Sequence, residues 1–299
     1  MPSVPTNAPI VVGVEDTDAG RLAAAWAADE AALHGRPLRL VRALDWPFGA
    51  DESLAPKAPW ETWHSRYRDA NRRFLNEVRT AALARHPNLH VDERLTDGTA
   101  EHVLGEAAEG ASMVVLGSRH LSSLREAFTT GSVAVPVIAH ASCPVAVIRH
   151  APHSDATPTP PTVVVGVDGS RGADLAMEFA FDEASAHGAS VLAVLAWSFP
   201  LGTGATMVAD AAARDSRETL ERSLTSWTAR YPDVPAHGEV RAGHPVRMLT
   251  EASEDALSLV VGSRGVGGFR RMLLGSVSHG LVHHARCPLV VVPSGSDDA

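Results

Sequence analysis

The sequence is nearly without lysine: Lys57, which follows Pro56, is the only one among its 26 basic residues. A Walker A loop needs a lysine on the β- and γ-phosphates, and a protein kinase needs one on a strand. A single lysine in a proline-rich segment fits neither class. Any nucleotide site in this chain would therefore hold phosphate with backbone N–H groups, hydroxyls and arginine.

Cysteine is also scarce, with only Cys143 and Cys287, each followed by proline and an apolar run. Two cysteines so far apart make neither a disulfide framework nor a metal site. We expect both to be small buried hydrophobic residues in front of a strand. Redox sensing is the alternative.

Positive charge and long apolar runs are lacking as well. Lys and Arg number 26 against 35 Asp and Glu, a net charge of −9, and no basic run occurs, which disfavours nucleic-acid binding. No apolar stretch approaches the ~18 residues of a membrane span. The N-terminus, residues 1–5, lacks the charged-then-apolar order of a signal peptide. We therefore expect a cytoplasmic protein with no nucleic-acid or membrane partner.

The chain contains a long internal repeat. Its 299 residues suggest about two domains of ~150 residues each. Residues 10–47 align with 163–200 without a gap, and from Gly13 onward 13 of 35 positions are identical. A repeat of this length is a duplicated domain rather than a solenoid unit. The sequence predicts domains at 1–150 and 163–299, joined by a stiff proline-rich linker at 151–162.

Within each half, apolar β-branched runs alternate with segments of helical period. In the second half we predict strands at 163–167, 191–196, 239–241, 257–261 and 289–292, with helices at 173–187, 209–231, 246–255 and 276–284. The strands are almost continuously apolar, which is typical of a sheet covered on both faces. Strand–helix alternation implies right-handed crossovers and parallel strands. The predicted fold class is α/β, with two tandem doubly wound parallel-sheet domains.

Two loops of the second half carry the candidate chemistry. Asp168 follows one predicted strand, and a glycine-rich loop, 262–268, follows another and leads to Gly275 and Ser276 at a helix start. Ligands of open parallel sheets lie beyond the carboxyl ends of strands, where strand order reverses. Glycines and a helix N-terminus present N–H groups to an anion, and Asp168 could accept hydrogen bonds from a ribose or base. The pattern predicts a nucleotide across this point; a tight turn packed by glycines is the alternative.

The spacing Gly262-x2-Gly265-x9-Gly275-Ser276 resembles the Gly-x2-Gly-x9-Gly-Ser/Thr signature of the ATP-binding universal stress proteins. The opening at 165–170 and the closing run at 287–292 are also similar to that family, and the resemblance covers nearly the whole chain as a tandem pair. It implies strand order 3-2-1-4-5 in each five-stranded domain. It also implies ATP as the ligand, with Mg²⁺ left open, and a regulatory role in the stress response.

The resemblance also implies roles for single residues. Asp168 and the strand end near Ala196 would meet adenine or ribose, and the loop and helix start would surround the phosphates. The residues implied in the second half are Gly166, Asp168, Ala196, Gly262, Ser263, Arg264, Gly265, Gly268, Gly275, Ser276, Val277 and Ser278.

The first half departs from the signature. Glu15 replaces the aspartate, and His120 stands where the second glycine belongs, so that a side chain intrudes on backbone contacts. Its candidate residues are Gly13, Gly117, His120, Gly131 and Ser132. His120 could itself donate to phosphate. A second nucleotide site and a purely structural partner domain both stay open.

Three functions fit these features. The first is an ATP-binding regulatory protein whose conformation, assembly or partner affinity follows nucleotide state. The second is a weak ATPase or phosphotransferase, disfavoured because no lysine serves the phosphates and no carboxylate cluster for Mg²⁺ lies beside the glycine loop. The third is a nucleotide-free interaction scaffold. The short apolar last strands of the halves, 145–148 and 289–292, are edges that seek a partner. By resemblance we expect the two halves to pair, and the chain to form a homodimer.

Two weaker signals have simpler explanations. His279 and His283 have the i, i+4 spacing of a two-histidine metal face but lack a third ligand at suitable spacing, so solvated or interface histidines are expected. Trp60 and Trp63, with Tyr67, are expected to pack in a core or interface rather than to stack on a base.

Overall fold

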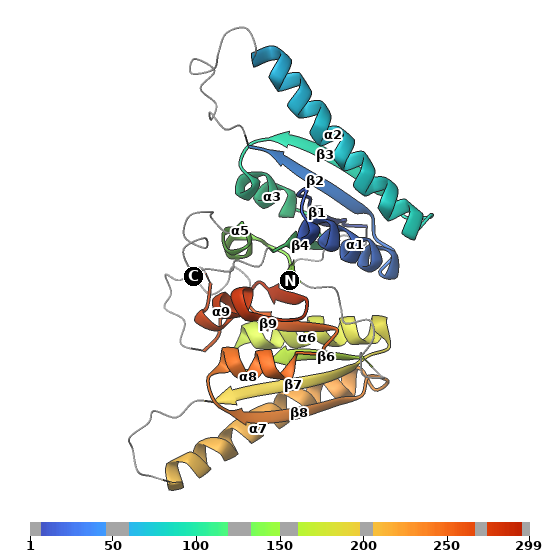
Figure 1. Ribbon diagram of the computed structural model, residues 1–299. Coiled ribbons are helices and arrows are strands. Elements are labelled where there is room, and N and C mark those ends of the chain that lie inside the picture. Colours follow the sequence, from blue (N-terminus) through green and yellow to red (C-terminus); the bar gives the residue numbers. More distant parts are fainter. Residues whose placement is uncertain are drawn as a thin grey trace. The chain divides into compact units, whose positions relative to one another are not determined.

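The computed structural model describes residues 7–45, 60–118, 133–149, 161–197, 206–266 and 274–294 (Figure 1). The chain divides into two compact units, Met1–Arg149 and His150–Ala299. Most of the predicted linker lies outside the described residues, and its last residue, Thr162, already belongs to a strand.

The first unit alternates strands and helices along the chain. Its elements are β1 (Ile10–Gly13), α1 (Asp18–Leu33), β2 (Leu38–Leu44), α2 (Trp60–Arg85), β3 (Val91–Asp97), α3 (Ala100–Ala108), β4 (Met113–Gly117), α5 (Ala134–His140) and β5 (Val145–Ile148).

The second unit repeats this order. Its elements are β6 (Thr162–Gly166), α6 (Arg171–His187), β7 (Ser190–Trp197), α7 (Thr206–Arg230), β8 (Ala236–Ala242), α8 (Pro245–Ala252), β9 (Ser258–Gly262), α9 (Ser276–His284) and β10 (Leu289–Val292).

Strand order is the same in both units, and it confirms the predicted fold class. The first unit runs β3-β2-β1-β4-β5, and the second, in matching order, β8-β7-β6-β9-β10. The strand pairs within each unit are parallel. Strand order therefore reverses between β1 and β4 in the first unit and between β6 and β9 in the second, where a ligand crevice is expected.

Helices cover both faces of each unit's strands, as the second unit shows in Figure 1. There α6 and α7 lie on one face, and α8 and α9 lie on the other. The same division holds in the first unit, with α1 and α2 opposite α3 and α5. Central strands buried on both faces must be apolar, and Val163, Val164 and Val165 of β6 are at most 1 % exposed.

The outer strands β3 and β8 depart from the apolar pattern. No residue of β8 is fully buried, and polar side chains such as Glu239 and Arg241 pair along it. The sequence predicts only a short strand at 239–241, whereas β8 has seven residues. The apolar signal is weak there because an edge strand has a neighbour on one side only and stays partly solvated.

The first helix of each unit begins at a side-chain cap. Thr17 Oγ1 accepts a hydrogen bond from the Gly20 N–H at 3.1 Å, and Ser170 Oγ accepts one from the Ala173 N–H at 3.1 Å. Such caps satisfy N–H groups that lack a partner inside the helix. They fix where the β1–α1 and β6–α6 loops turn, and so where Asp168 lies.

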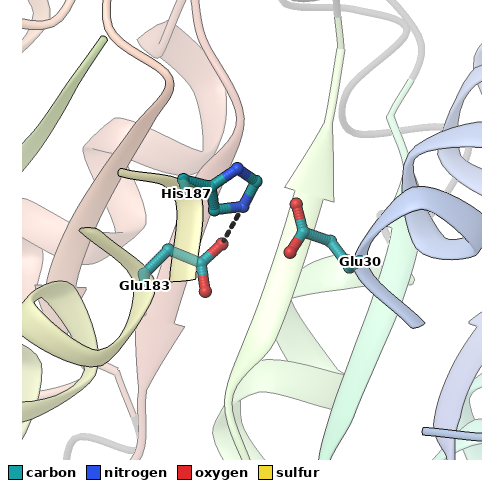
Figure 2. A group of neighbouring side chains, drawn as sticks. All are labelled: Glu30, Glu183 and His187. Atoms are coloured by element: carbon teal, nitrogen blue, oxygen red, sulfur yellow. Dashed lines mark ion pairs between the residues drawn. The ribbon is translucent and has the colours of Figure 1, made fainter. Parts of the chain in front are cut away.

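The same helices bury a glutamate near their ends. Glu183 is 3 % exposed, and the His187 side chain, one turn later, lies 3.2 Å from it (Figure 2). Glu30 and His34 form the matching pair in the first unit at 3.5 Å. A buried carboxylate is unfavourable without a polar partner, and this partner is supplied within the helix in both units.

Candidate functional site

A cavity of about 470 Å³ opens at the reversal point of the second unit, where β6 and β9 end. Loops after these two strands, the end of β7 and the first turns of α6, α8 and α9 surround it. It is lined by Gly166, Val167, Asp168, Ser170, Ala173, Val194, Ala196, Pro245, Leu249, Val261, Gly262, Arg264, Gly265, Val266, Gly275, Ser276, Val277 and Ser278. The lining thus includes an apolar wall and a second wall made of the described residues of the glycine loop and a helix start.

Asp168 joins two loops of this cavity. Its Oδ1 accepts a hydrogen bond from the Ser170 N–H at 3.0 Å, and its Oδ2 accepts one from the Val266 N–H at 2.9 Å. Asp168 also acts on Asp174, whose pKa is raised by burial and by this neighbouring negative charge. The carboxylate therefore has a structural role in addition to the ligand contact that the sequence predicts.

Gly262 ends β9 where α6 passes close to the strand. A side chain there would place its Cβ 2.7 Å from the backbone carbon and oxygen of Gly172. Contacts below 3 Å with rigid backbone are not tolerated, so the absence of a side chain is what lets the helix and strand approach. The first glycine of the signature therefore serves packing at the cavity floor.

The start of α9 faces the cavity. Gly275 is its N-cap residue, no side chain caps the helix, and the Gly275 N–H donates to the Ser263 carbonyl at 2.8 Å. Ser278 Oγ donates to the Gly262 carbonyl at 2.6 Å, which ties the helix start to the end of β9. An uncapped helix N-terminus with its partial positive charge is suited to an anion.

Ser263 is the described second-half candidate that does not line the cavity. It is 6 % exposed, its Oγ lies 3.1 Å from Ser294 Oγ, and it accepts a hydrogen bond from the Ser294 N–H at 3.1 Å. Its side chain therefore joins β9 to the segment after β10. The other described candidates of the second half line the cavity, and Gly268 lies outside the described residues.

The apolar wall was missed by sequence reasoning. Val194, Pro245 and Leu249 line the cavity, and Leu249 is 4 % exposed. Pro245 is the first residue of α8 and follows the end of β8 after Gly243 and His244, so its position past a strand end was the available signal. Apolar residues in a helix are also what an ordinary core requires, which is why they did not stand out.

The first unit has a cavity of about 380 Å³ at the equivalent place. Of the candidate residues, Gly13 and Gly117 line it, whereas His120, Gly131 and Ser132 lie outside the described residues. Its lining residues are Gly13, Val14, Glu15, Gly20, Val41, Arg42, Ala43, Asp45, Tyr67, Ala100, Leu104, Leu116, Gly117, Ser118, Val133 and Ala134.

Charge distinguishes this first cavity from the second. Glu15 and Asp45 both line it, together with Arg42. The Arg42 guanidinium donates to Asn71 Oδ1 at 2.8 Å and to the Val14 carbonyl at 2.9 Å. Much of its donor capacity is thus used within the protein, while two carboxylates line the cavity.

Both cysteines are buried, at 3 % exposure for Cys143 and 4 % for Cys287. Burial raises the pKa of the Cys143 thiol to about 12 and that of Cys287 to about 11. Redox reactions of cysteine proceed through the thiolate, which burial suppresses here. The expected role as buried apolar residues fits these surroundings better than redox sensing does.

The two weaker signals have distinct outcomes. The His279 and His283 rings meet edge-on with centroids 5.1 Å apart, and neither joins a group of three potential metal ligands among the described residues. Trp63 stacks on Tyr67 with centroids 5.2 Å apart, yet it is 38 % exposed, so of the two expected settings, core or interface, the core is wrong for this side chain and the interface stays a prediction. The side chain of Trp60 lies outside the described ones.

Taken together, the strand order and the cavity at each reversal point define a tandem, doubly wound α/β protein with a candidate ligand site in each half. The sequence model of the universal stress protein family matches residues 6–149 and 161–293, and the chain belongs to that family. None of the described helices is both long and apolar enough to cross a membrane.

Relatives of similar length support this assignment. Universal stress protein Rv2005c of Mycobacterium tuberculosis (strain ATCC 25618 / H37Rv) is 37 % identical over 291 residues, covering 94 % of this chain and 96 % of its own. Universal stress protein Rv1996 of the same strain is 34 % identical over 322 residues, covering 100 % and 99 %. A crystal structure of a universal stress protein from Archaeoglobus fulgidus DSM 4304 has a TM-score of 0.67 at 15 % identity, over 99 % of this chain and 100 % of that chain. That likeness shows the shared fold.

Proposed function

We propose that this universal stress protein binds ATP in the cavity of its second unit and acts as a nucleotide-dependent regulator rather than as an enzyme. The carrying observation is that one cavity of about 470 Å³ brings together Asp168, the glycine loop and the uncapped start of α9. These groups come from three separate stretches of sequence, and a glycine turn alone would not require them to meet.

The phosphates are assigned to the glycine-loop wall. Ser276 and Val277 belong to the first turn of α9, where N–H groups have no partner within the helix. Arg264 lines the same wall and supplies the positive charge that the missing lysine would supply in a Walker A loop. This arrangement supports recognition of an anion by backbone and guanidinium donors.

The adenine and ribose are assigned to the apolar wall. Ala196 at the end of β7, with Leu249 and Pro245 of α8, offers a surface of small and branched apolar groups. Ligand sites are typically apolar with a few placed polar groups, and a base fits such a wall. Asp168 retains lone pairs beyond its two hydrogen bonds and is placed to accept from a ribose hydroxyl or base amine.

Binding without rapid hydrolysis is proposed because the cavity offers little catalytic machinery among its described residues. Its lining there contains one carboxylate, Asp168, and both of its oxygens accept backbone N–H groups. Mg²⁺ would then be held by phosphate and water more than by this protein. Pairing of the two halves and formation of a homodimer belong to the same proposal, as routes by which nucleotide could control assembly.

Calorimetry on nucleotide-stripped full-length protein tests the proposal. We expect the wild type to bind ATP and Gly275→Asp to lose binding, because a carboxylate at the helix start repels phosphate. Ser185→Asp, an equal charge change on an exposed residue near the far end of α6, should bind as the wild type does. If the wild type gives no heat of binding at millimolar ATP, the nucleotide-free interaction scaffold is the remaining function. If the wild type hydrolyses ATP and Gly275→Asp does not, the ATPase alternative is favoured.

A further inference from the structure

Gly265, the second glycine of the signature, lies directly against Asp168. A Cβ built on Gly265 would be 2.2 Å from Asp168 Oδ2 and 3.4 Å from Asp168 Cγ, with no other described heavy atom within 4 Å besides its chain neighbours. No side chain larger than hydrogen fits there while the carboxylate keeps its place. The obstacle is therefore one side chain, and among the described residues nothing else crowds this position.

Backbone conformation does not explain the glycine. Gly265 is absent from the six described glycines with positive φ, which are Gly35, Gly98, Gly110, Gly169, Gly188 and Gly243. An alanine could adopt the Gly265 backbone without the strain that a left-handed conformation imposes. Gly265 is also exposed, so a methyl group there would not overfill a core.

The carboxylate that excludes a side chain at Gly265 also binds the loop. Asp168 Oδ2, the atom nearest to the hypothetical Cβ, accepts the Val266 N–H at 2.9 Å. Asp168 Oδ1 accepts the Ser170 N–H at 3.0 Å, which fixes the side chain to its own loop. Hydrogen bonds to an ionised acceptor are stronger than neutral ones. The carboxylate thus holds the glycine loop at a set distance from the end of β6.

The two halves of the chain differ at both of these positions together. Where the second half has Asp168 and Gly265, the first half has Glu15 and His120 in the aligned places. A longer acidic side chain and the loss of the glycine occur in the same half, as expected if the two positions depend on each other.

We propose that Asp168 is a positioning residue that holds the glycine loop in its binding shape before any ligand arrives, and that Gly265 is glycine because Asp168 occupies its side-chain space. We call the two hydrogen bonds of Asp168, to the N–H groups of Ser170 and Val266, the brace. What the brace is for rests on the proposed function, because the loop that it holds is the wall to which the phosphates are assigned. The brace itself is a property of the nucleotide-free protein and is tested without nucleotide.

Hydrogen exchange in the nucleotide-free, full-length protein is the first test. In Asp168→Asn, which keeps the side chain's size but only one acceptor oxygen, either the Ser170 or the Val266 N–H loses its partner, so exchange of the segment around one of these two residues should rise about fivefold or more. Asp255→Asn removes an exposed carboxylate that precedes β9, at the opposite end of that strand, and should leave exchange in both segments unchanged. Unchanged exchange in Asp168→Asn would overturn the proposal.

A double substitution tests the dependence between the two positions. Gly265→Ala should displace the carboxylate and raise exchange as Asp168→Ala does. Among the described residues only Asp168 obstructs the new methyl group. Hydrogen exchange around Val266 in the double variant, Asp168→Ala with Gly265→Ala, should therefore be no faster than in Asp168→Ala alone. Effects that multiply in the double variant would mean that Gly265 serves the loop independently of Asp168, which contradicts the proposal.

Ligand affinity separates positioning from direct contact. If Asp168 acts through the loop, Asp168→Asn should weaken ATP binding by a larger factor than adenosine binding, because the phosphates contact the loop. Equal factors for both ligands would show that Asp168 contacts only the base or ribose, and would overturn the positioning role. If the wild type binds neither ligand, the ATP proposal fails, while the exchange measurements still decide whether the brace exists.

Discussion

Ser278 Oγ donates a hydrogen bond to the carbonyl of Gly262 at 2.6 Å, across 16 positions of sequence. Ser278 is 4 % exposed and lies in the first turn of α9, whereas Gly262 is the last residue of β9. This bond connects the strand end to the helix start on either side of the glycine loop. The two ends of the loop are thereby fixed by the fold rather than by a ligand.

Ser278→Ala is therefore expected to destabilise the protein by about 1–3 kcal/mol, since it leaves the Gly262 carbonyl without this donor. Ser276→Ala, at an exposed position two residues earlier, should change the free energy of unfolding by no more than about 0.5 kcal/mol. Urea denaturation of both variants measures the difference. Equal losses of stability in the two variants would contradict the assigned hydrogen bond.

Gly262→Ala is expected to destabilise the protein by about 3 kcal/mol or more, because the new methyl group meets the Gly172 backbone at 2.7 Å. Gly105→Ala is the matched control. Gly105 lies within α3 with no described atom near its side-chain position, so the same substitution should stabilise by about 0.5–1 kcal/mol. Thermal unfolding of the two variants should therefore shift in opposite directions, and a fall in both would refute the packing explanation.

One ATP per chain is the expected stoichiometry. The first cavity has Glu15 and Asp45 in its lining, and Arg42 there already donates to Asn71 and to the Val14 carbonyl. Negative charge beside the ligand raises the energy of bound triphosphate. Calorimetric titration gives the number of sites directly. Two sites, or one site that survives Gly275→Asp, would place nucleotide in the first half.

Both cysteines should resist alkylation in the folded protein. With pKa values of about 12 for Cys143 and about 11 for Cys287, the thiolate fractions at pH 8 are on the order of one in ten thousand and one in a thousand. Mass spectrometry after iodoacetamide treatment should find no label without urea and two labels in its presence. Rapid labelling of the folded chain would revive the redox alternative.

The same thiols should make stability fall at alkaline pH. The ordinary thiol pKa is about 8.5, so between that pH and about 11 the unfolded chain loses protons that the folded chain keeps. The unfolded state then binds fewer protons, and the free energy of unfolding decreases as pH rises. Urea denaturation at pH 7, 9 and 10 measures this free energy. It should decrease less with pH in the double variant, Cys143→Ala with Cys287→Ala, than in the wild type.

Much of the fold was readable from local sequence. Val163–Val165 and Leu259–Val261 are apolar without interruption because both faces of a central parallel strand are covered, and such runs predict strands wherever they occur. The internal repeat predicted two like domains, and the strand order followed from the family resemblance. The edge strand β8 was predicted too short because solvated strands lack this apolar signal.

The candidate site was only partly readable. The glycine spacing located the loop and the helix start, but the same pattern placed Ser263 in the site, where the fold instead directs it to Ser294. It also left out Leu249, whose apolar side chain is indistinguishable from a core residue in sequence. A glycine in the sequence indicates that a side chain is excluded at that position, but it does not indicate which atoms exclude it.

The sequence by itself thus determined the duplication, the α/β alternation and the loops that hold the candidate chemistry, because these depend on residue type and on periodicity along the chain. Tertiary structure decided which groups meet. Asp168 and Val266 are 98 positions apart, and their hydrogen bond exists only because β6 and β9 are neighbours in the sheet. Position 265 has no room for a side chain because Asp168 lies beside it, and only folding brings the two residues together.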